Sequence, residues 1–330
     1  MTAPASPASD VLTFGETMLA LRCPGPLEQG GGATTAVAGA ESNVAVGLAR
    51  LGHRAAWAGR VGADEPGRLI LRTLRGEGVD VTHAVADDSA PTGAMLRERR
   101  VADLARVHYW RAGSAASRTT PRDLEPALSD GTRVLHLTGI TCALGDGPRD
   151  AVRAAAEHAH ARGRTVALDV NHRARLWSRA TAAGVLRPLL PYVDVLIASD
   201  DELPVVAGDP GETGGAGDEG EAARIASLLS SGVGEVVVKR GAGGAEVHGP
   251  DGLFETAAAL DVPVVDTVGA GDAFCAGYLS GLLDGLGPAE RLHRGTVLGG
   301  FAVATAGDWE GLPHRDELGL LDAVPGSAVR

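Results

Sequence analysis

The chain has few aromatic residues, 3% of its 330 positions, and a single lysine, Lys239. Without many large rings the core must be built from Ala, Val and Leu, and this composition suits helices packed closely on a parallel sheet. Arginine supplies all the other long basic side chains of this sequence. The one lysine therefore suggests a role that the planar guanidinium of arginine cannot fill, and chance is the alternative.

The sequence also lacks an excess of basic residues, long apolar runs and paired cysteines. The formal net charge is −12, whereas a sequence-independent nucleic-acid binder needs the opposite sign, so we expect no nucleic-acid partner. No segment approaches the roughly 20 apolar residues of a membrane span, so we expect no membrane association. The three cysteines have no metal-ligand spacing and predict reduced thiols in a cytoplasmic protein. Residues 1–10, rich in Ala, Pro and Ser, predict a disordered tail.

Alternating strand and helix patterns run through the rest of the chain, 11–330, and predict an α/β domain with a mostly parallel sheet covered on both faces. The expected strands cover residues 11–15, 55–61, 134–137, 165–170, 193–198 and 235–239. The expected helices cover residues 42–52, 66–78, 147–162, 180–190, 219–230, 270–283 and 289–305. The Gly- and acid-rich segment 208–220 predicts a surface loop.

Residues 92–101 and 105–111 alternate like two half-exposed strands with a turn around Asp103, and no helix lies between them. They predict a hairpin outside the main sheet, which together with parts of 14–37 would form a small β lid. Tyr109 and Arg111 would share one face of the hairpin, and Trp110 the other. Since lid edges are exposed, we expect a homo-oligomer through the lid, with Trp110 at the interface.

The segment 266–274, with the sequence DTVGAGDAF, carries the strongest chemical signal. Gly269 and Gly271 allow a sharp turn, after which the amides of residues 269–272, Ala270 among them, would point out of a helix N-terminus toward an anion. Asp272 could take the proton of an attacking hydroxyl. The alternative is an ordinary Asp-capped helix. A dinucleotide fingerprint needs a small residue where Phe274 stands, and a Walker A loop needs a lysine that is absent here.

This segment resembles the C-terminal signature of the ribokinase-like (PfkB-type) carbohydrate kinases. Residues 39–45, GAESNVA, followed by 48–52, LARLG, resemble the first signature of the same family, and the resemblance extends over about 11–316. It implies a ribokinase-like fold with a small β-sheet lid, and phosphoryl transfer from ATP, assisted by Mg²⁺, with Asp272 as catalytic base.

Three further stretches resemble the 2-keto-3-deoxygluconate kinases within this family: VHYWRAGSA at 107–115, LDVNHRARLW at 168–177 and AGDWEG at 306–311. They imply a keto-deoxy sugar acid phosphorylated on its terminal hydroxyl. Met95 and His172 stand where aromatics are common in that subgroup. The alternatives are a fructokinase, a ribokinase, a 2-keto-3-deoxygalactonate kinase or a catalytically silent nucleotide- or sugar-binding regulator.

The resemblance implies a sugar site lined by Gly39, Tyr109, Arg111, Arg173, Asp272 and Asp308. A guanidinium fork matches a carboxylate bidentately, so Arg111 and Arg173 are expected to meet the acid group from two sides. For Arg97, Arg99 and Arg100 we prefer a solvated surface charge.

Polar segments follow three neighbouring strands, at 171–173, 199–202 and 239–244, where a parallel sheet binds its ligands. The resemblance implies that ATP is held by Asn171, Arg173, Ser199, Lys239, Arg240, Gly241, Gly243, Gly244, Gly269 and Gly271. A plain hairpin turn is the alternative at Gly243 and Gly244. Ser199 replaces the family's usual asparagine, and Glu202 would order water around Mg²⁺.

Overall fold

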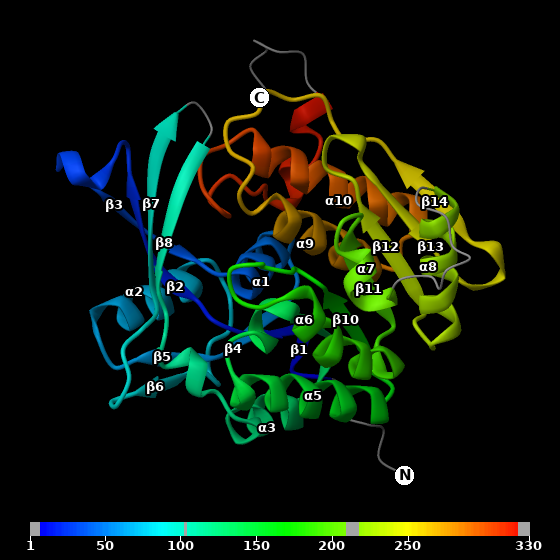
Figure 1. The fold of residues 1–330 in the computed structure, drawn as a ribbon, viewed down its shortest axis with the longest axis horizontal. Helices are drawn as coiled ribbons and strands as arrows, with labels where there is room; N and C mark the ends of the chain where they lie inside the picture. Colours follow the sequence, from blue (N-terminus) through cyan, green and yellow to red (C-terminus); the bar gives the residue numbers. More distant parts are fainter. Residues whose placement is uncertain (1–6, 102–103, 209–217, 323–330) are drawn as a thin grey trace.

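The computed structural model describes residues 7–101, 104–208 and 218–322, and its central feature is a sheet between two layers of helices (Figure 1). Within these residues the sheet has eight strands in the order β14-β13-β12-β11-β10-β9-β1-β4. Their bounds are β1 (Ser9–Phe14), β4 (Ala55–Ala58), β9 (Thr132–Thr138), β10 (Thr165–Asp169), β11 (Val195–Ser199), β12 (Glu235–Lys239), β13 (Ala245–His248) and β14 (Phe254–Ala257).

Neighbouring strands from β4 to β12 run parallel, whereas β12, β13 and β14 form antiparallel pairs at one edge. The parallel order brings the carboxyl ends of the strands to one side of the sheet. The polar segments that follow β10, β11 and β12 therefore lie together, as the sequence predicts.

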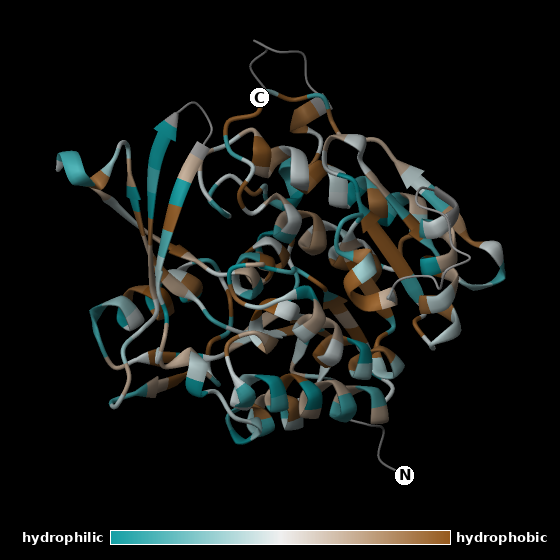
Figure 2. Ribbon diagram, viewed as in Figure 1, coloured by the Kyte–Doolittle hydropathy of each residue, from teal (hydrophilic) through white to brown (hydrophobic). Residues whose placement is uncertain are grey.

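Successive side chains along the strands point to opposite faces of the sheet and pack into two separate hydrophobic cores, one on each face. On one face they pack against five helices: α3 (Pro121–Asp130), α5 (Asp146–Ala161), α6 (Arg179–Leu186), α7 (Leu203–Ala207) and α8 (Asp218–Ser230). On the other they pack against four: α1 (Ala40–Arg50), α2 (Glu65–Gly76), α9 (Ala270–Leu283) and α10 (Pro288–Val303). A short helix, α4 (Gly139–Cys142), follows β9. Figure 2 shows hydrophobic residues in inner strands such as β12 and hydrophilic ones on α3 and α5.

A second sheet stands to one side of this body and is called the lid below (Figure 1). It consists of β2 (Met18–Cys23), β3 (Thr34–Ala38), β7 (Ala94–Val101) and β8 (Leu104–Trp110), in the order β3-β2-β7-β8. The predicted hairpin is therefore confirmed, although its turn at Asp103 lies outside the described residues. Two short strands, β5 (Arg60–Gly62) and β6 (Val85–Asp87), pair beside it.

Several boundaries differ from the sequence prediction for local reasons. β1 begins at Ser9, so Ser9 and Asp10 belong to the sheet and not to the tail. α6 ends at Leu186 and continues as 3₁₀ turns through Tyr192, because Pro188 and Pro191 remove the amide donors that an α-helix needs. The predicted loop 208–220 falls mostly outside the described residues, and α8 begins at Asp218. No helix within the described ranges is long and apolar enough to cross a membrane.

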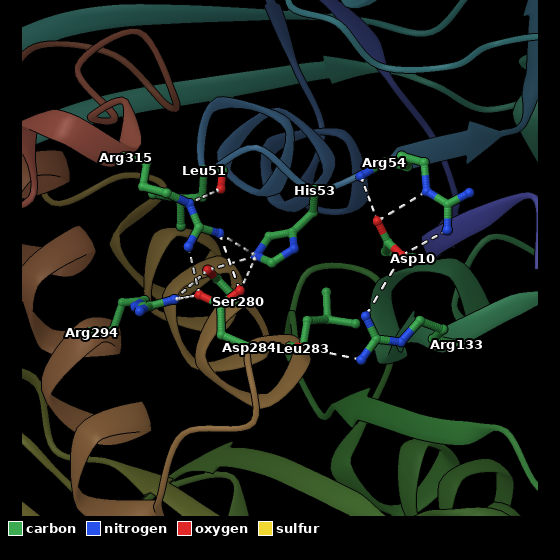
Figure 3. Close-up of polar contacts among 10 residues, drawn as sticks. All are labelled: Asp10, Leu51, His53, Arg54, Arg133, Ser280, Leu283, Asp284, Arg294 and Arg315. Atoms are coloured by element: carbon green, nitrogen blue, oxygen red, sulfur yellow. Dashed lines mark hydrogen bonds and ion pairs between the residues drawn. The ribbon is translucent and has the colours of Figure 1, made fainter.

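The amino-terminal ends of the strands, opposite the polar segments, are held by two ionic clusters (Figure 3). Asp284, just after α9, accepts bonds from Arg294 at 2.5 Å and Arg315 at 2.7 Å. Asp10 on β1 pairs with Arg54 at 2.9 Å and lies 3.7 Å from Arg133. The hydrogen bond from Arg54 lowers the pKa of Asp10 to about 2. Burial raises the pKa of Asp284, but the hydrogen bonds from Arg315 and Arg294 outweigh it and lower the value to about 2.

Candidate active site

Asp272 lies in the first turn of α9, where its side chain is buried. Asn43 on α1 donates its amide hydrogen to Oδ2 at 2.8 Å, and Asn171 donates to Oδ1 at 3.4 Å. Burial raises the pKa of Asp272 to about 6, against the opposing effects of the Asn43 hydrogen bond and the Arg173 charge. A carboxylate with this pKa is ionised at neutral pH yet remains a usable proton acceptor.

The predicted turn before α9 forms as expected. Gly269 adopts the left-handed conformation, φ 77°, and a Cβ at this position would lie 2.1 Å from the carbonyl oxygen of Asp308. Only glycine satisfies both constraints. The first amides of a helix have no partner within the helix, so Gly271 and Asp272 offer donors beside the buried carboxylate, whereas the Ala270 amide donates to the carbonyl oxygen of Thr267 at 3.5 Å.

Lys239, the only lysine of the chain, ends β12 beside this turn. Its Nζ lies 2.8 Å from Oδ1 of Asp169 and would lie 3.5 Å from a Cβ on Gly271. Burial favours the neutral amine, but the Asp169 charge outweighs it and raises the pKa of Lys239 above its ordinary value. A compact ammonium thus lies next to the amides of α9, which gives the lone lysine a specific place.

Asn171 links the two aspartates at the carboxyl ends of the strands. Its amide donates to Asp169 at 3.3 Å as well as to Asp272. Its backbone is left-handed, φ 37°, a conformation that asparagine tolerates better than most residues and that is often found at functional sites. A continuous polar chain therefore runs from Lys239 through Asp169 and Asn171 to the predicted base.

On the lid, Tyr109 and Arg111 lie together as predicted, with the Arg111 guanidinium 5.6 Å from the Tyr109 ring centre. Arg111 is already paired: its Nη2 lies 2.5 Å from Oε2 of Glu16, a fully buried carboxylate just after β1. Ser114 donates to the other oxygen of Glu16 at 2.5 Å. Glu16 was not anticipated, although its place at the carboxyl end of a strand could have pointed to it.

Arg173 is exposed on the loop after β10, and its charge reaches Asp272. The same loop touches the lid, because Arg175 donates to the carbonyl oxygen of Val107 on β8 at 2.8 Å. The loop and the lid are therefore in contact, and the meeting of Arg173 and Arg111 at one acid group stays a prediction.

Asp308 and Gly39 also lie in this region. Asp308 is buried, which raises its pKa to about 7, and the Asp272 charge contributes to that shift. A Cβ on Gly39, which precedes α1, would lie 2.5 Å from the carbonyl oxygen of Glu16. The structure thus brings Gly39, Asp272 and Asp308 to one end of the sheet.

The residues predicted for the nucleotide have mostly local partners. Glu202 accepts the backbone amides of His172 at 2.7 Å and Ser199 at 2.9 Å, which joins the loops after β10 and β11. The Ser199 hydroxyl donates to Asp201 at 2.7 Å. Among the described residues there is no group of three or more His, Cys, Asp or Glu side chains placed to hold a metal.

The glycine-rich loop after β12 is a hairpin connection in its backbone. The Arg240 amide donates to the Gly244 carbonyl oxygen at 2.8 Å, and the loop 241–243 connects β12 to β13. A Cβ on Gly244 would lie 2.0 Å from the carbonyl oxygen of Ala257, so packing alone requires glycine there. The Arg240 guanidinium binds Glu221 and Glu246.

The expectation for Arg97 is wrong. Its side chain is partly buried and donates to both oxygens of Asp266, one of them at 2.7 Å, in the segment that precedes α9. The prediction of a surface charge fits Arg100 better, because its Nη1 lies 3.8 Å from Oε1 of Glu28 and 3.9 Å from Oε1 of Glu98. Arg97 has no sequence signal of its own, because its partner lies 169 positions away.

Comparisons with known proteins agree with this geometry. Residues 8–315 match the family model described as pfkB family carbohydrate kinase. The chain is 36% identical to 2-dehydro-3-deoxygluconokinase of Bacillus subtilis (strain 168), with 94% of each chain covered. It is also 36% identical to the protein of the same name in Thermoproteus tenax, with 97% of each covered. The crystal structure of 2-dehydro-3-deoxygluconokinase from Thermotoga maritima superposes with a TM-score of 0.83 at 27% identity, over 95% of this chain and 99% of that one.

Proposed function

Since this chain belongs to the pfkB family of carbohydrate kinases, we propose that it transfers the γ-phosphate of ATP to the terminal hydroxyl of a keto-deoxy sugar acid. The first candidate is 2-keto-3-deoxygluconate, the 2-dehydro-3-deoxygluconate of the relatives' names, with its 6-phosphate as product. The observation that carries the proposal is the buried Asp272, which Asn43 holds at the amino terminus of α9.

In this reaction Asp272 accepts the proton of the attacking hydroxyl. The amides of the first turn of α9 and the neighbouring ammonium of Lys239 are proposed to offset the negative charge of the phosphoryl group in transfer. Positioning is the remaining contribution, and the rigid links of Asp272 to Asn43 and Asn171 supply it.

Mg²⁺ would neutralise charge on the phosphates of ATP. Glu202 is the residue proposed to hold it through water. Each of its oxygens accepts one backbone amide, and a carboxylate has about four acceptor sites, so acceptor capacity is left for the waters that Mg²⁺ retains. Ser199, Gly241 and Gly243 are proposed to line the ATP site beside it.

The acid group of the substrate is proposed to bind Arg173 first and Arg111 second. Arg111 shares its charge with Glu16 at 2.5 Å. Arg173 is exposed, and the described residues give it no ion pair. A substrate carboxylate is therefore proposed to be attracted chiefly by Arg173, while Arg111 and Tyr109 would orient the chain of the sugar from the lid.

ATP consumption over a panel of sugars tests this function: 2-keto-3-deoxygluconate, 2-keto-3-deoxygalactonate, fructose and ribose. We expect turnover of the two acids, and Asp272→Asn should lower this turnover about 10²–10⁴-fold. Asp284→Asn, at the opposite end of α9, is the matched control and should retain turnover. A preference for fructose or ribose would mean that the substrate is a neutral sugar and not an acid. ATP binding without any turnover would indicate a silent regulator.

The protein is further proposed to assemble as a cytoplasmic homo-oligomer through the lid. Trp110 is 56% exposed on β8, on the face opposite Tyr109, and such a ring gains by being covered. The three cysteines are unpaired and buried, which is compatible with a reducing compartment.

A further inference from the structure

We propose that Arg97 is a positioning residue for phosphoryl transfer: from the lid it holds the Asp266 carboxylate and, through it, the turn that begins α9. The inference rests on the proposed function for the step that it serves. It assigns Arg97 no contact with substrate or nucleotide.

The contact between Arg97 and Asp266 joins the lid to the body with good geometry. The guanidinium donates two hydrogen bonds, one to each oxygen, and the Nη2–Oδ1 distance is 2.7 Å. Both side chains are largely withdrawn from water, with 18% and 8% of their surface exposed. A bidentate pair of this kind fixes direction as well as distance, which a lysine at this position could not do.

Asp266 passes this constraint to two backbone segments. Its Oδ1 accepts the amide of Val268 at 3.1 Å, inside the turn that leads to Asp272. Its Oδ2 lies 3.5 Å from the amide nitrogen of Gly307, next to Asp308. Gly269 in turn packs against the carbonyl of Asp308. One carboxylate therefore connects the lid, the turn before α9 and the segment that carries Asp308.

A second arginine supports the same junction. Arg22 on β2 is paired in register with Arg97 on β7, so both side chains leave the same face of the lid. Arg22 binds Glu310 at 2.6 Å and lies 3.8 Å from Asp308. The lid thus rests on the body through two adjacent cations, and only Arg97 reaches the turn before α9.

Loss of the pair has a predictable local effect. Burial disfavours the charge on Asp266, and the hydrogen bonds from Arg97 outweigh it, so that the pKa of Asp266 is lowered. Without Arg97 the carboxylate must turn toward water, because a buried charge without a partner is unstable. The amides of Val268 and Gly307 then lose their acceptor, and the turn that presents the α9 amides loosens.

The test compares Arg97→Met with Arg100→Met, which removes an arginine of the same strand without touching Asp266. For Arg97→Met we expect kcat for the preferred sugar acid to fall about 10- to 100-fold, the loss typical of a small misplacement of catalytic groups, while KM changes less than about threefold. Arg97→Lys should recover part of kcat. Asp266→Asn should match Arg97→Met, and the double variant should lose no more than either.

Hydrogen exchange of the ligand-free protein supplies a second readout that needs no substrate. Peptides containing Val268 and Gly307 should exchange faster in Arg97→Met than in Arg100→Met or the unchanged protein. Unchanged exchange in both peptides, or a rise in KM with kcat intact, would overturn the inference. If the unchanged protein phosphorylates no sugar, the proposed function fails, and the exchange result still decides whether Arg97 holds the turn.

Discussion

Arg111 and Glu16 form an ion pair of 2.5 Å in which the glutamate has no exposed side-chain surface. The arginine predicted to bind a substrate anion therefore already has an internal one. Its guanidinium still has further donors, but its charge is largely balanced. Selection for an acidic substrate should accordingly depend more on Arg173 than on Arg111.

Arg173→Met should lower kcat/KM for the sugar acid by at least about 30-fold, corresponding to about 2 kcal/mol, because a charge-assisted contact is lost. Turnover of any neutral sugar should change less, and the melting temperature should stay the same. Steady-state kinetics with both substrate classes checks this. An equal loss for acid and neutral sugars would remove Arg173 from carboxylate recognition.

Arg111→Met should differ from Arg173→Met by destabilising the protein. It leaves Glu16 buried without its cation, which typically costs about 3–5 kcal/mol of unfolding free energy. Urea unfolding measures the effect, and adding Glu16→Gln to the variant should restore much of the loss. If Arg111→Met unfolds like the unchanged protein, the pair with Glu16 does not stabilise the fold.

Asn43→Ala should move the acidic limb of the pH profile. Asn43 donates to Asp272 and so keeps its pKa, about 6, lower than burial alone would make it. Removing the donor should shift the acidic limb of kcat/KM to higher pH, since that limb reports the base in the free enzyme. Asp284→Asn serves as the control and should leave the limb in place. An acidic limb that Asn43→Ala leaves unmoved would mean that Asn43 does not set the pKa of Asp272.

Asp272→Asn should make the protein more stable at neutral pH. The folded carboxyl has a pKa of about 6, against an ordinary value of 3.8, so the folded state binds its proton more tightly than the unfolded state. The contribution of this group to the free energy of unfolding is fully present below about pH 4 and is lost as the pH rises through 6. At pH 7 the loss amounts to up to about 3 kcal/mol. The variant's advantage in chemical unfolding should therefore shrink between pH 7 and pH 5.

Asp284→Asn should show the opposite pH dependence. The pKa of Asp284 is lowered to about 2 (Figure 3), so its stabilisation is present above about pH 4 and is lost as pH falls toward 2. At pH 7 we expect a loss of about 1 kcal/mol, reduced because Arg315 is partly exposed. Thermal melting at pH 7 and pH 3 checks this, and kcat and KM should not change.

Trp110→Glu should shift the protein toward the monomer. The exposed ring lies on the outer face of the lid, and a charge there would oppose the burial on which the proposed assembly depends. We also expect KM for the sugar acid to rise, because Tyr109 precedes Trp110 on β8 and Arg111 follows it directly. Sedimentation decides the matter: an unchanged mass would mean that the lid does not mediate assembly.

The main sheet was predictable because its strands are short apolar runs that Gly and charged residues interrupt. β12 and α9 match their predicted ranges residue for residue. The edge hairpin of β13 and β14 was missed, since β14 is mostly exposed and has no apolar run. α3 was missed as well, because Pro126 interrupts its helical pattern.

The candidate site divides in the same way. Asp272, Gly269 and Lys239 stand in local motifs or are rare, so the sequence points to them. Glu16 and Arg97 take their importance from partners that lie 95 and 169 positions away (Arg111 and Asp266), and no local pattern encodes such distances. The surface interpretation of Arg97 failed for this reason.

Lys239 carries the only ε-amine of the chain, and Asp169 covers it. Reductive methylation with isotopically labelled formaldehyde can therefore modify one lysine besides the α-amino group, and the ion pair with Asp169 should slow the reaction at Lys239. The rate of labelling then measures how often this corner of the protein is exposed to water. Once attached, the two methyl groups would give a single lysine resonance without overlap, placed beside the turn where phosphate is proposed to pass.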